Sequence, residues 1–467
     1  PEDSWAFLKR MLDHPDGPAW NYEVGDRIEA HDLVEYESFR AELEQLREAH
    51  GSVPPPLLLK RIDALRNRVP LLGRRIPQGF DLERDWPAVP ASDREDLARS
   101  PQYFADMDTK LDRLIVYDTS GMTGHALVAP SHPLTQAKVN ALMEFVLKRH
   151  GVELDTGPGK AICVNINAQA ETVVFATLFG VWNQAGFAKV NLHPKFWRDR
   201  DAARNWFTEF QPQFLTGDPV AFAEMIAWEL PVRPRALVST ALALNPELAE
   251  LLEEAYGCPV IDWYSTAETG PLAYSCPHGH GLHLISPDLF IEVLDADGKA
   301  LPEGQRGEIA VTGGRNPYIF LLRYRTGDTA SIDRTPCSCG DSLPRLLGLE
   351  GRRPLLFRGH DGGPVNSVDV SRVLRHHPIL QHQVRQQADS SILARLRPIP
   401  GAPLDSRAVE RSLRTLFGDL AMDIYIDPNL GADSQSGKVL PFVSELAPEP
   451  GNPALAAALG ASPPSSS

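Results

Sequence analysis

The sequence lacks several features that would assign it quickly to a class of protein. It contains no run of about 18 apolar residues, and its first residues do not show the basic, apolar and small-residue pattern of a secretory signal. It has no Lys- or Arg-rich block, and its 61 acidic residues outnumber its 46 basic residues for a net charge of -15. These absences predict a cytoplasmic protein that spans no membrane and binds no nucleic acid.

Cysteine is also scarce, with five residues in a chain of 467. So few cysteines do not make a disulfide framework, and two of them, Cys337 and Cys339, are separated by one residue. Cys276 and His283 lie beside Pro and Gly turns in a segment that would flank the same β element. Four such ligands can bind a tetrahedral structural zinc, so the set is a candidate zinc site. The two histidines between Cys276 and His283 are competing ligands, and ordinary packing is the alternative.

From residue 113 onward, short apolar stretches alternate with helical patterns. This alternation predicts an α/β fold with a mostly parallel sheet covered by helices on both faces. The predicted strands are residues 113–117, 161–167, 187–192, 236–240 and 258–264, and the predicted helices are residues 133–149, 170–182, 199–210 and 246–256. Asn245 and Gly257 bound the last helix as residue types that begin and end helices.

The remaining segments differ in pattern from this central part. Residues 1–100 are mostly helical in pattern, and residues 288–335 contain two strands around a turn at Asp297-Gly298. The second pattern predicts a small antiparallel β subdomain beside the main sheet. We therefore predict a large N-terminal domain at 1–351, a small α+β C-terminal domain at 352–447, and a Pro-, Ala- and Ser-rich, disordered tail at 448–467.

Two loops follow predicted parallel strands, at the end where such sheets bind ligands. The first loop, "TSGMTG" at 119–124, combines glycines that let backbone N–H groups approach an anion with hydroxyls that donate to it. The second, in "WYSTAETG", places Tyr264 four residues before Glu268, which suggests a nucleotide ring and a magnesium ion. An ordinary turn is the alternative for each loop. His125 follows the first loop in place of a lysine, and the chain has no Gly-x-Ser-x-Gly, which excludes P-loop NTPases and serine hydrolases.

Six motifs stand in the order typical of one family. Over residues 110–445 the chain resembles the AMP-forming adenylating enzymes, the superfamily of acyl-CoA synthetases and adenylation domains, and within it the phenylacetate–CoA ligase branch. The motifs that carry the resemblance are "TSGMTG" (119–124), "WYSTAETGP" (263–271), "GHGLHL" (279–284), "RYRTGD" (323–328), "GRR" (351–353) and "SGK" (436–438).

The resemblance implies a role for residues in each motif. Tyr264 would stack on adenine, Glu268 would hold magnesium, and Asp328 would accept hydrogen bonds from both ribose hydroxyls. Arg352 would orient the nucleotide, and Lys438 on a mobile C-terminal domain would bridge the substrate carboxylate and the α-phosphate. The residues that would wrap the ATP phosphates are Thr119, Ser120, Gly121, Thr123 and Gly124.

The implied reaction has two steps. ATP and a carboxylic acid give an acyl-adenylate and pyrophosphate, and a nucleophile, by resemblance CoA, then displaces AMP. The resemblance places the acid beside strand 161–167 and the turn at 239–244, where the aromatic residues suit a flat aromatic acid, with ordinary core packing as the alternative. The candidate pocket residues are Phe179, Trp182, Ala241 and Trp263. Some members of the branch also carry a zinc site, which supports the cysteine and histidine set.

The chain departs from the family pattern at two positions. Ala267 stands where Thr or Ser usually precedes the glutamate, and Pro354 stands where Asp or Lys usually marks the hinge between domains. The second change puts the CoA step in question. An amine or a carrier-protein thiol as acceptor, and a non-catalytic nucleotide-binding protein, are therefore the alternatives. The sequence leaves the acid and the choice between monomer and homodimer open.

Overall fold

The computed structural model describes residues 2–46, 51, 53–118, 128–169, 171–285, 287–351, 355–431 and 439–446. The chain divides into two compact units, a larger one that contains the described residues up to 351 and a smaller one that contains most of those after 355. Among the described residues, no helix has the length and apolar character needed to cross a membrane.

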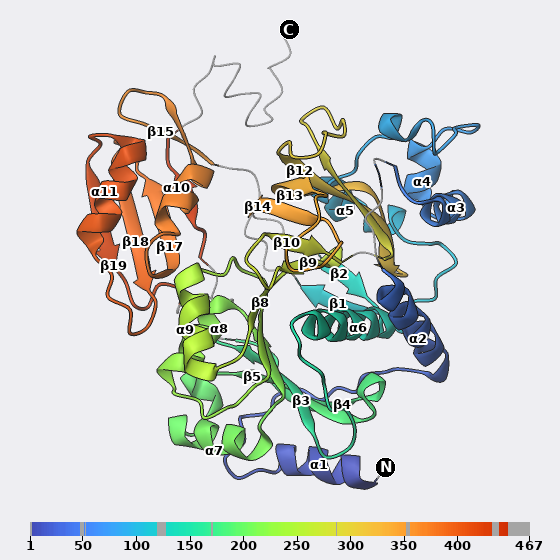
Figure 1. Cartoon of the computed structure of the whole chain (residues 1–467), viewed down its shortest axis with the longest axis horizontal. Helices are drawn as coiled ribbons and strands as arrows, with labels where there is room; N and C mark the ends of the chain where they lie inside the picture. The colour runs from blue at the N-terminus through green and yellow to red at the C-terminus, as the bar shows by residue number, and fades with distance from the viewer. Residues whose placement is uncertain are drawn as a thin grey trace. The chain divides into compact units, whose positions relative to one another are not determined.

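Helices dominate the first hundred residues (Figure 1). Local groups fix the starts of two of these helices. The Asp93 side chain accepts a hydrogen bond from the backbone N–H of Asp96, which begins α5, and Pro56 opens α3 where no backbone donor is needed. The elements are α1 (Glu2–Leu12), α2 (Ala30–Gln45), α3 (Pro56–Leu65), α4 (Pro70–Arg75), η1 (Trp86–Ala88), α5 (Arg94–Arg99) and η2 (Pro101–Tyr103).

A sheet of twelve strands forms the centre of the larger unit, in the order β11-β12-β13-β14-β10-β9-β8-β7-β6-β3-β5-β4. Strands β5, β3, β6, β7 and β8 are mutually parallel, which confirms the predicted parallel part. Helices α7, α8 and α9 connect β5 to β6, β6 to β7 and β7 to β8, because parallel strands need a crossover, whereas β3 reaches β5 through the edge strand β4. The elements of this half are α6 (Pro133–Arg149), β3 (Ala161–Asn167), β4 (Phe175–Phe179), β5 (Ala185–Asn191), η4 (Pro194–Phe196), α7 (Arg200–Phe210), β6 (Phe214–Gly217), α8 (Pro219–Ala227), β7 (Ala236–Ser239), α9 (Pro246–Tyr256) and β8 (Val260–Thr266).

The helix predicted at 170–182 is not present over residues 171–182, the part of it that the structure describes. Residues 175–179 form β4, residues Gly180–Trp182 form a 3-10 turn (η3), and β4 pairs antiparallel with β5 at the sheet edge. Asn183 and Gln184 both adopt positive φ, at 54° and 63°, and reverse the chain. The apolar run was compatible with either structure, and a turn at Asn-Gln rather than Asn-Gly gives a weak hairpin signal.

The antiparallel half of the sheet continues directly from β8. The predicted strands around Asp297-Gly298 pair with each other, but they extend the main sheet instead of standing beside it. The elements are β9 (Gly270–Ser275), β10 (Leu282–Leu284), β11 (Leu289–Leu294), β12 (Gly307–Asn316), β13 (Ile319–Asp333) and β14 (Arg345–Glu350), and a separate hairpin joins β1 (Ile115–Asp118) to β2 (Val128–Ser131).

The smaller unit packs two helices on a four-stranded sheet of order β19-β18-β17-β20. Val409, Leu413 and Phe417 lie one helical turn apart on α11 and are fully buried in the core of this unit. The elements are β15 (Leu356–Arg358), β16 (Pro364–Asn366), α10 (Ser367–Leu374), β17 (Ile379–Gln386), β18 (Ile392–Pro398), α11 (Ser406–Phe417), β19 (Met422–Ile426) and β20 (Phe442–Ser444).

Candidate active site

The structure brings together the predicted adenine and ribose residues. The Tyr264 hydroxyl donates a hydrogen bond of 2.7 Å to Oδ2 of Asp328, although 64 positions separate them. Burial, reinforced by the negative charges of Asp328 and Glu268, raises the pKa of Tyr264 well above its ordinary value. The phenol therefore stays protonated and continues to donate to the Asp328 carboxylate.

A bulge in β13 positions Asp328. Between the pairs Glu308–Thr329 and Ala310–Arg325, three residues of β13 face one residue of β12. Gly327 sits in this bulge at a φ of 84°, a conformation that favours glycine, and its N–H donates to the Glu308 carboxylate at 2.9 Å. The "TGD" sequence therefore has a specific local use, which is to turn the Asp328 carboxylate toward β8.

Glu268 lies in the turn between β8 and β9, and it is 5% exposed. Its Oε1 accepts a hydrogen bond of 2.7 Å from Arg94 and one of 2.9 Å from the hydroxyl of Tyr324. Its Oε2 is buried and has no hydrogen-bond partner within the part of the chain that the structure describes. A buried, unpartnered carboxylate oxygen is costly and fits a hard cation such as magnesium, which takes oxygen ligands.

Arg94 contacts the candidate magnesium ligand Glu268, and the sequence motifs did not reveal this contact. It begins α5 in the N-terminal helical segment, 174 positions from Glu268, and its side chain is 19% exposed. An arginine in "SDRED" carries no local signal of such a partner, because its neighbours are those of any capped surface helix. Tyr324, the other residue that donates to Glu268, lies inside the motif "RYRTGD", so the sequence did mark its neighbourhood.

Several predicted residues lie outside the described residues. These are the phosphate-loop residues Thr119, Ser120, Gly121, Thr123 and Gly124, the nucleotide residue Arg352, the hinge residue Pro354 and the lysine Lys438. Their roles stay predictions.

Two of the candidate pocket aromatics, Trp182 and Trp263, are buried in one core cluster, and the half-buried Phe179 packs against it. Trp182 is 2% exposed and its indole N–H donates to the Glu144 carboxylate at 2.5 Å, while Phe179 stacks on Phe187 at 4.7 Å between ring centroids. Trp263 is 4% exposed in the same cluster. Ala241, in contrast, is exposed in the loop after β7 and adopts a φ of 69°, which is unusual for alanine.

The predicted cysteine and histidine residues converge on one point. The ligand atoms of Cys276, His283, Cys337 and Cys339 all lie within 4.8 Å of one another. Sγ of Cys276 is 3.6 Å from Sγ of Cys337, and Sγ of Cys339 is 3.3 Å from Nε2 of His283. A tetrahedral ion with bonds of about 2.0–2.3 Å requires ligand separations of roughly 3.5–3.8 Å, close to these values.

The surroundings of the cluster suit metal ligation as well. Nδ1 of His283 is 3.0 Å from the Leu343 carbonyl oxygen, so the ring donates there and presents Nε2 to the cluster. Burial lowers the pKa of His283, which favours the neutral ring that binds metals. The Asp341 N–H points at Sγ of Cys339 and the His278 N–H at Sγ of Cys276, both at 3.4 Å, an arrangement that stabilises thiolates.

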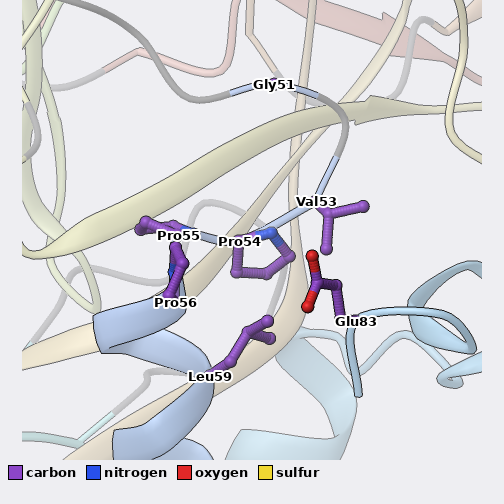
Figure 2. Close-up of a pocket in the computed structure, with 7 residues that line it drawn as sticks. All are labelled: Gly51, Val53, Pro54, Pro55, Pro56, Leu59 and Glu83. Atoms are coloured by element: carbon purple, nitrogen blue, oxygen red, sulfur yellow. The ribbon is translucent and has the colours of Figure 1, made fainter. Parts of the chain in front are cut away.

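A separate surface pocket lies in the N-terminal helical segment and has a volume of about 320 Å³ (Figure 2). Its walls are three consecutive prolines and small apolar side chains, with one acidic group, and we assign it no ligand. The lining residues are Gly51, Val53, Pro54, Pro55, Pro56, Leu59 and Glu83.

Known proteins show similarity to this chain, although no protein-family model matches it. Naringenin synthase of Pestalotiopsis fici is 28% identical over 189 residues, which are 35% of this chain and 7% of that protein. Phenylacetate-coenzyme A ligase of Thermus thermophilus is 25% identical over 367 residues, which are 73% of this chain and 80% of that protein. The chain thus spans a small part of the first relative and most of the second.

A solved structure shares the fold. The 2-hydroxyisobutyryl-CoA ligase in its postadenylation state, in complex with R3-HIB-AMP, superposes with a TM-score of 0.61 at 17% identity, covering 91% of this chain and 96% of that one. The ordered motifs, the meeting of Tyr264, Asp328 and Glu268, and these similarities agree. The sequence similarity to phenylacetate-coenzyme A ligase and the fold shared with the 2-hydroxyisobutyryl-CoA ligase agree with the resemblance of the motifs to the AMP-forming adenylating enzyme superfamily.

Proposed function

We propose that this protein uses ATP to convert a carboxylic acid, by our sequence analysis an aromatic one, into an acyl-adenylate, and then transfers the acyl group to CoA. One observation carries the proposal: Glu268 keeps a buried oxygen without a partner in the described residues, close to the hydrogen-bonded pair Tyr264–Asp328. A ring, a carboxylate acceptor and a cation ligand that lie close together are the components of a magnesium–nucleotide site.

The nucleotide contacts follow from this arrangement. Tyr264 would provide its ring to adenine, and the Asp328 carboxylate would accept hydrogen bonds from the ribose hydroxyls. Glu268 Oε2 would hold magnesium, which supplies neutralising charge for the phosphates when bound. Arg94 and Tyr324 bind the other oxygen of Glu268 and so fix the orientation of the carboxylate.

In the first step a carboxylate oxygen of the acid attacks the α-phosphorus, and the bond from that phosphorus to pyrophosphate breaks. Two anions must approach each other, so positive charge at the meeting point lowers the barrier. We assign this charge to Lys438 and the contacts to the phosphates to the loop at 119–124. In the second step a thiol attacks the acyl carbon, loses its proton, and AMP leaves.

CoA is proposed as acceptor because the relative from Thermus thermophilus is a coenzyme A ligase that aligns with 73% of this chain. An amine and a carrier-protein thiol are the alternatives, and comparing product formation with the three nucleophiles separates them. We also propose that the four-residue cluster around Cys337 holds a structural zinc ion, on the basis of its ligand types and separations.

Acid-dependent release of pyrophosphate, measured with a panel of aryl and alkyl acids, tests the function. Lys438→Ala should reduce that release by at least about 10²-fold, the scale for losing a charge aimed at the transition state. Lys299→Ala, at an exposed lysine in the turn between β11 and β12, is the matched control and should change nothing. ATP binding without pyrophosphate release for any acid would instead favour a non-catalytic nucleotide-binding protein.

A further inference from the structure

Lys189 lies in β5, on the face of the sheet that carries the aromatic cluster. Side chains alternate along a strand, so Lys189 shares a face with Phe187, which stacks on Phe179. The opposite face is covered by α1, because a Cβ added at Gly186 would lie 2.6 Å from the Phe7 ring. Lys189 is two residues before Asn191, where β5 ends, so it stands near the carboxyl ends of the parallel strands.

A row of polar side chains crosses this face at the level of Lys189. Lys189 pairs in register with Asn165 of β3, which in turn pairs with Thr216 of β6. Asn165 donates to the Thr216 hydroxyl at 2.8 Å, and Asn167 donates to the Asn165 carbonyl oxygen at 2.9 Å. Two residues earlier on the same face, the neighbouring row contains Phe187 and is apolar. The row with Lys189 is therefore the point where this face changes from apolar to polar.

The ammonium group of Lys189 makes no ion pair and no hydrogen bond with the residues that the structure describes. The residue is half-buried, and this burial alone lowers the pKa of its ammonium group, with no charged neighbour among the causes. An unpaired buried cation destabilises a fold, and buried charges that serve stability are paired. A lysine in this state, near the ligand-binding edge of the sheet, is therefore a candidate for contact with a ligand.

We propose that Lys189 selects acids that carry a second carboxylate at the end remote from the carboxyl group that is activated. The inference rests on the proposed function and names the substrate class for it. Register through β3, β6 and β7 aligns Lys189 with Ile261 of β8, so Lys189 shares its face of the sheet with the candidate pocket residue Trp263, which directly precedes Tyr264. β5 and β8 are four places apart, and four spacings of about 4.8 Å give roughly 19 Å. The remote carboxylate would therefore lie at β5 and the activated carboxyl group toward β8. Phe175 pairs with Lys189 on the neighbouring strand β4, and Phe187 lies two residues before Lys189 on the same face of β5. These two rings would flank the hydrocarbon part of the acid.

The test uses acids matched in shape but not in charge. One set is terephthalate, 4-methylbenzoate and 4-(aminomethyl)benzoate, and the aliphatic set is glutarate, pentanoate and 5-aminopentanoate. The quantity measured is kcat/KM for acid-dependent pyrophosphate release. The wild-type protein should prefer the dicarboxylate over its neutral partner by at least tenfold in one set. Lys189→Met should remove that preference, and Lys189→Glu should shift it toward the amino acid.

Two further measurements make each result decisive. Lys299→Met, at the exposed turn lysine, should keep the wild-type preference. Lys189→Met should also unfold at the same or a higher temperature, because it removes an unpaired buried charge. A clear fall in the unfolding temperature of Lys189→Met would mean that Lys189 stabilises the fold, which would overturn the proposal. A wild-type preference for the neutral acid would also overturn it, as would a preference for the dicarboxylate that stays unchanged in both Lys189 variants. If no acid releases pyrophosphate, the proposed function fails. The role of Lys189 is then tested by calorimetry, which compares the binding of the dicarboxylate and of its neutral partner to the wild type and to Lys189→Met.

Discussion

Replacing Arg94 with alanine should destabilise the larger unit and make its stability depend on Mg²⁺. Arg94 donates to Glu268 at 2.7 Å, and the two side chains are 19% and 2% exposed. Removing one partner of a buried ion pair costs about 3–5 kcal/mol, and the solvent access of Arg94 together with the remaining Tyr324 hydrogen bond lowers the expected loss to about 2–3 kcal/mol. The charge on Glu268 is then buried without a cationic partner.

Thermal unfolding of the full chain, with and without Mg²⁺, measures this effect. Mg²⁺ should raise the midpoint of Arg94→Ala more than that of the wild type, because the ion replaces the missing positive charge. Adding Glu268→Gln should restore most of the lost stability, since a neutral amide needs no counter-charge. Arg99→Ala is the matched control in the same helix, because Arg99 is 70% exposed and pairs with an exposed glutamate. Equal midpoints for Arg94→Ala and Arg99→Ala, or no recovery with Glu268→Gln, would refute the reasoning.

Three other predictions concern the remaining groups. Metal analysis should find about one zinc per chain, because four ligands bind one ion. Cys337→Ser should release the zinc, whereas the control Cys258→Ser should keep it. Wild-type protein that contains no metal would refute the zinc site. Tyr264→Phe removes the 2.7 Å hydrogen bond to Asp328, so the KM for ATP should rise about fivefold, as a bond worth about 1 kcal/mol implies, and an unchanged KM would argue against this contact. The pKa of Lys189 is lowered in the folded state. The gain in stability of Lys189→Met should therefore be full below that folded-state pKa and should vanish as the pH rises toward about 10.4, the pKa of an unfolded lysine. Denaturation curves that show a gain independent of pH would contradict this.

The sequence predicted best those features that local chemistry determines. Helix 246–256 was correct to the residue because Asn245 caps its first turn and Gly257 ends it at a φ of 64°. Tyr264 and Asp328 were found through motifs, which record long-range geometry that no single segment contains. Arg94 could not be found in this way, since its partner lies 174 positions away and its own neighbours only describe a capped helix. The error at 170–182 has a different cause: an apolar run of that length satisfies a buried strand and a buried helix alike.

Glu268 and Lys189 carry charges of opposite sign and stand at different places along the sheet. Glu268 keeps an unpartnered buried oxygen in the turn after β8, and Lys189 is an unpaired cation on β5. Each destabilises the free protein, and joining them to each other is impossible because three strands lie between β8 and β5. A magnesium-bound nucleotide would satisfy the first and an acid with a remote carboxylate the second. Bound together, these ligands should therefore stabilise the larger unit more than either does alone, and the excess should disappear in Lys189→Met when the acid is a dicarboxylate.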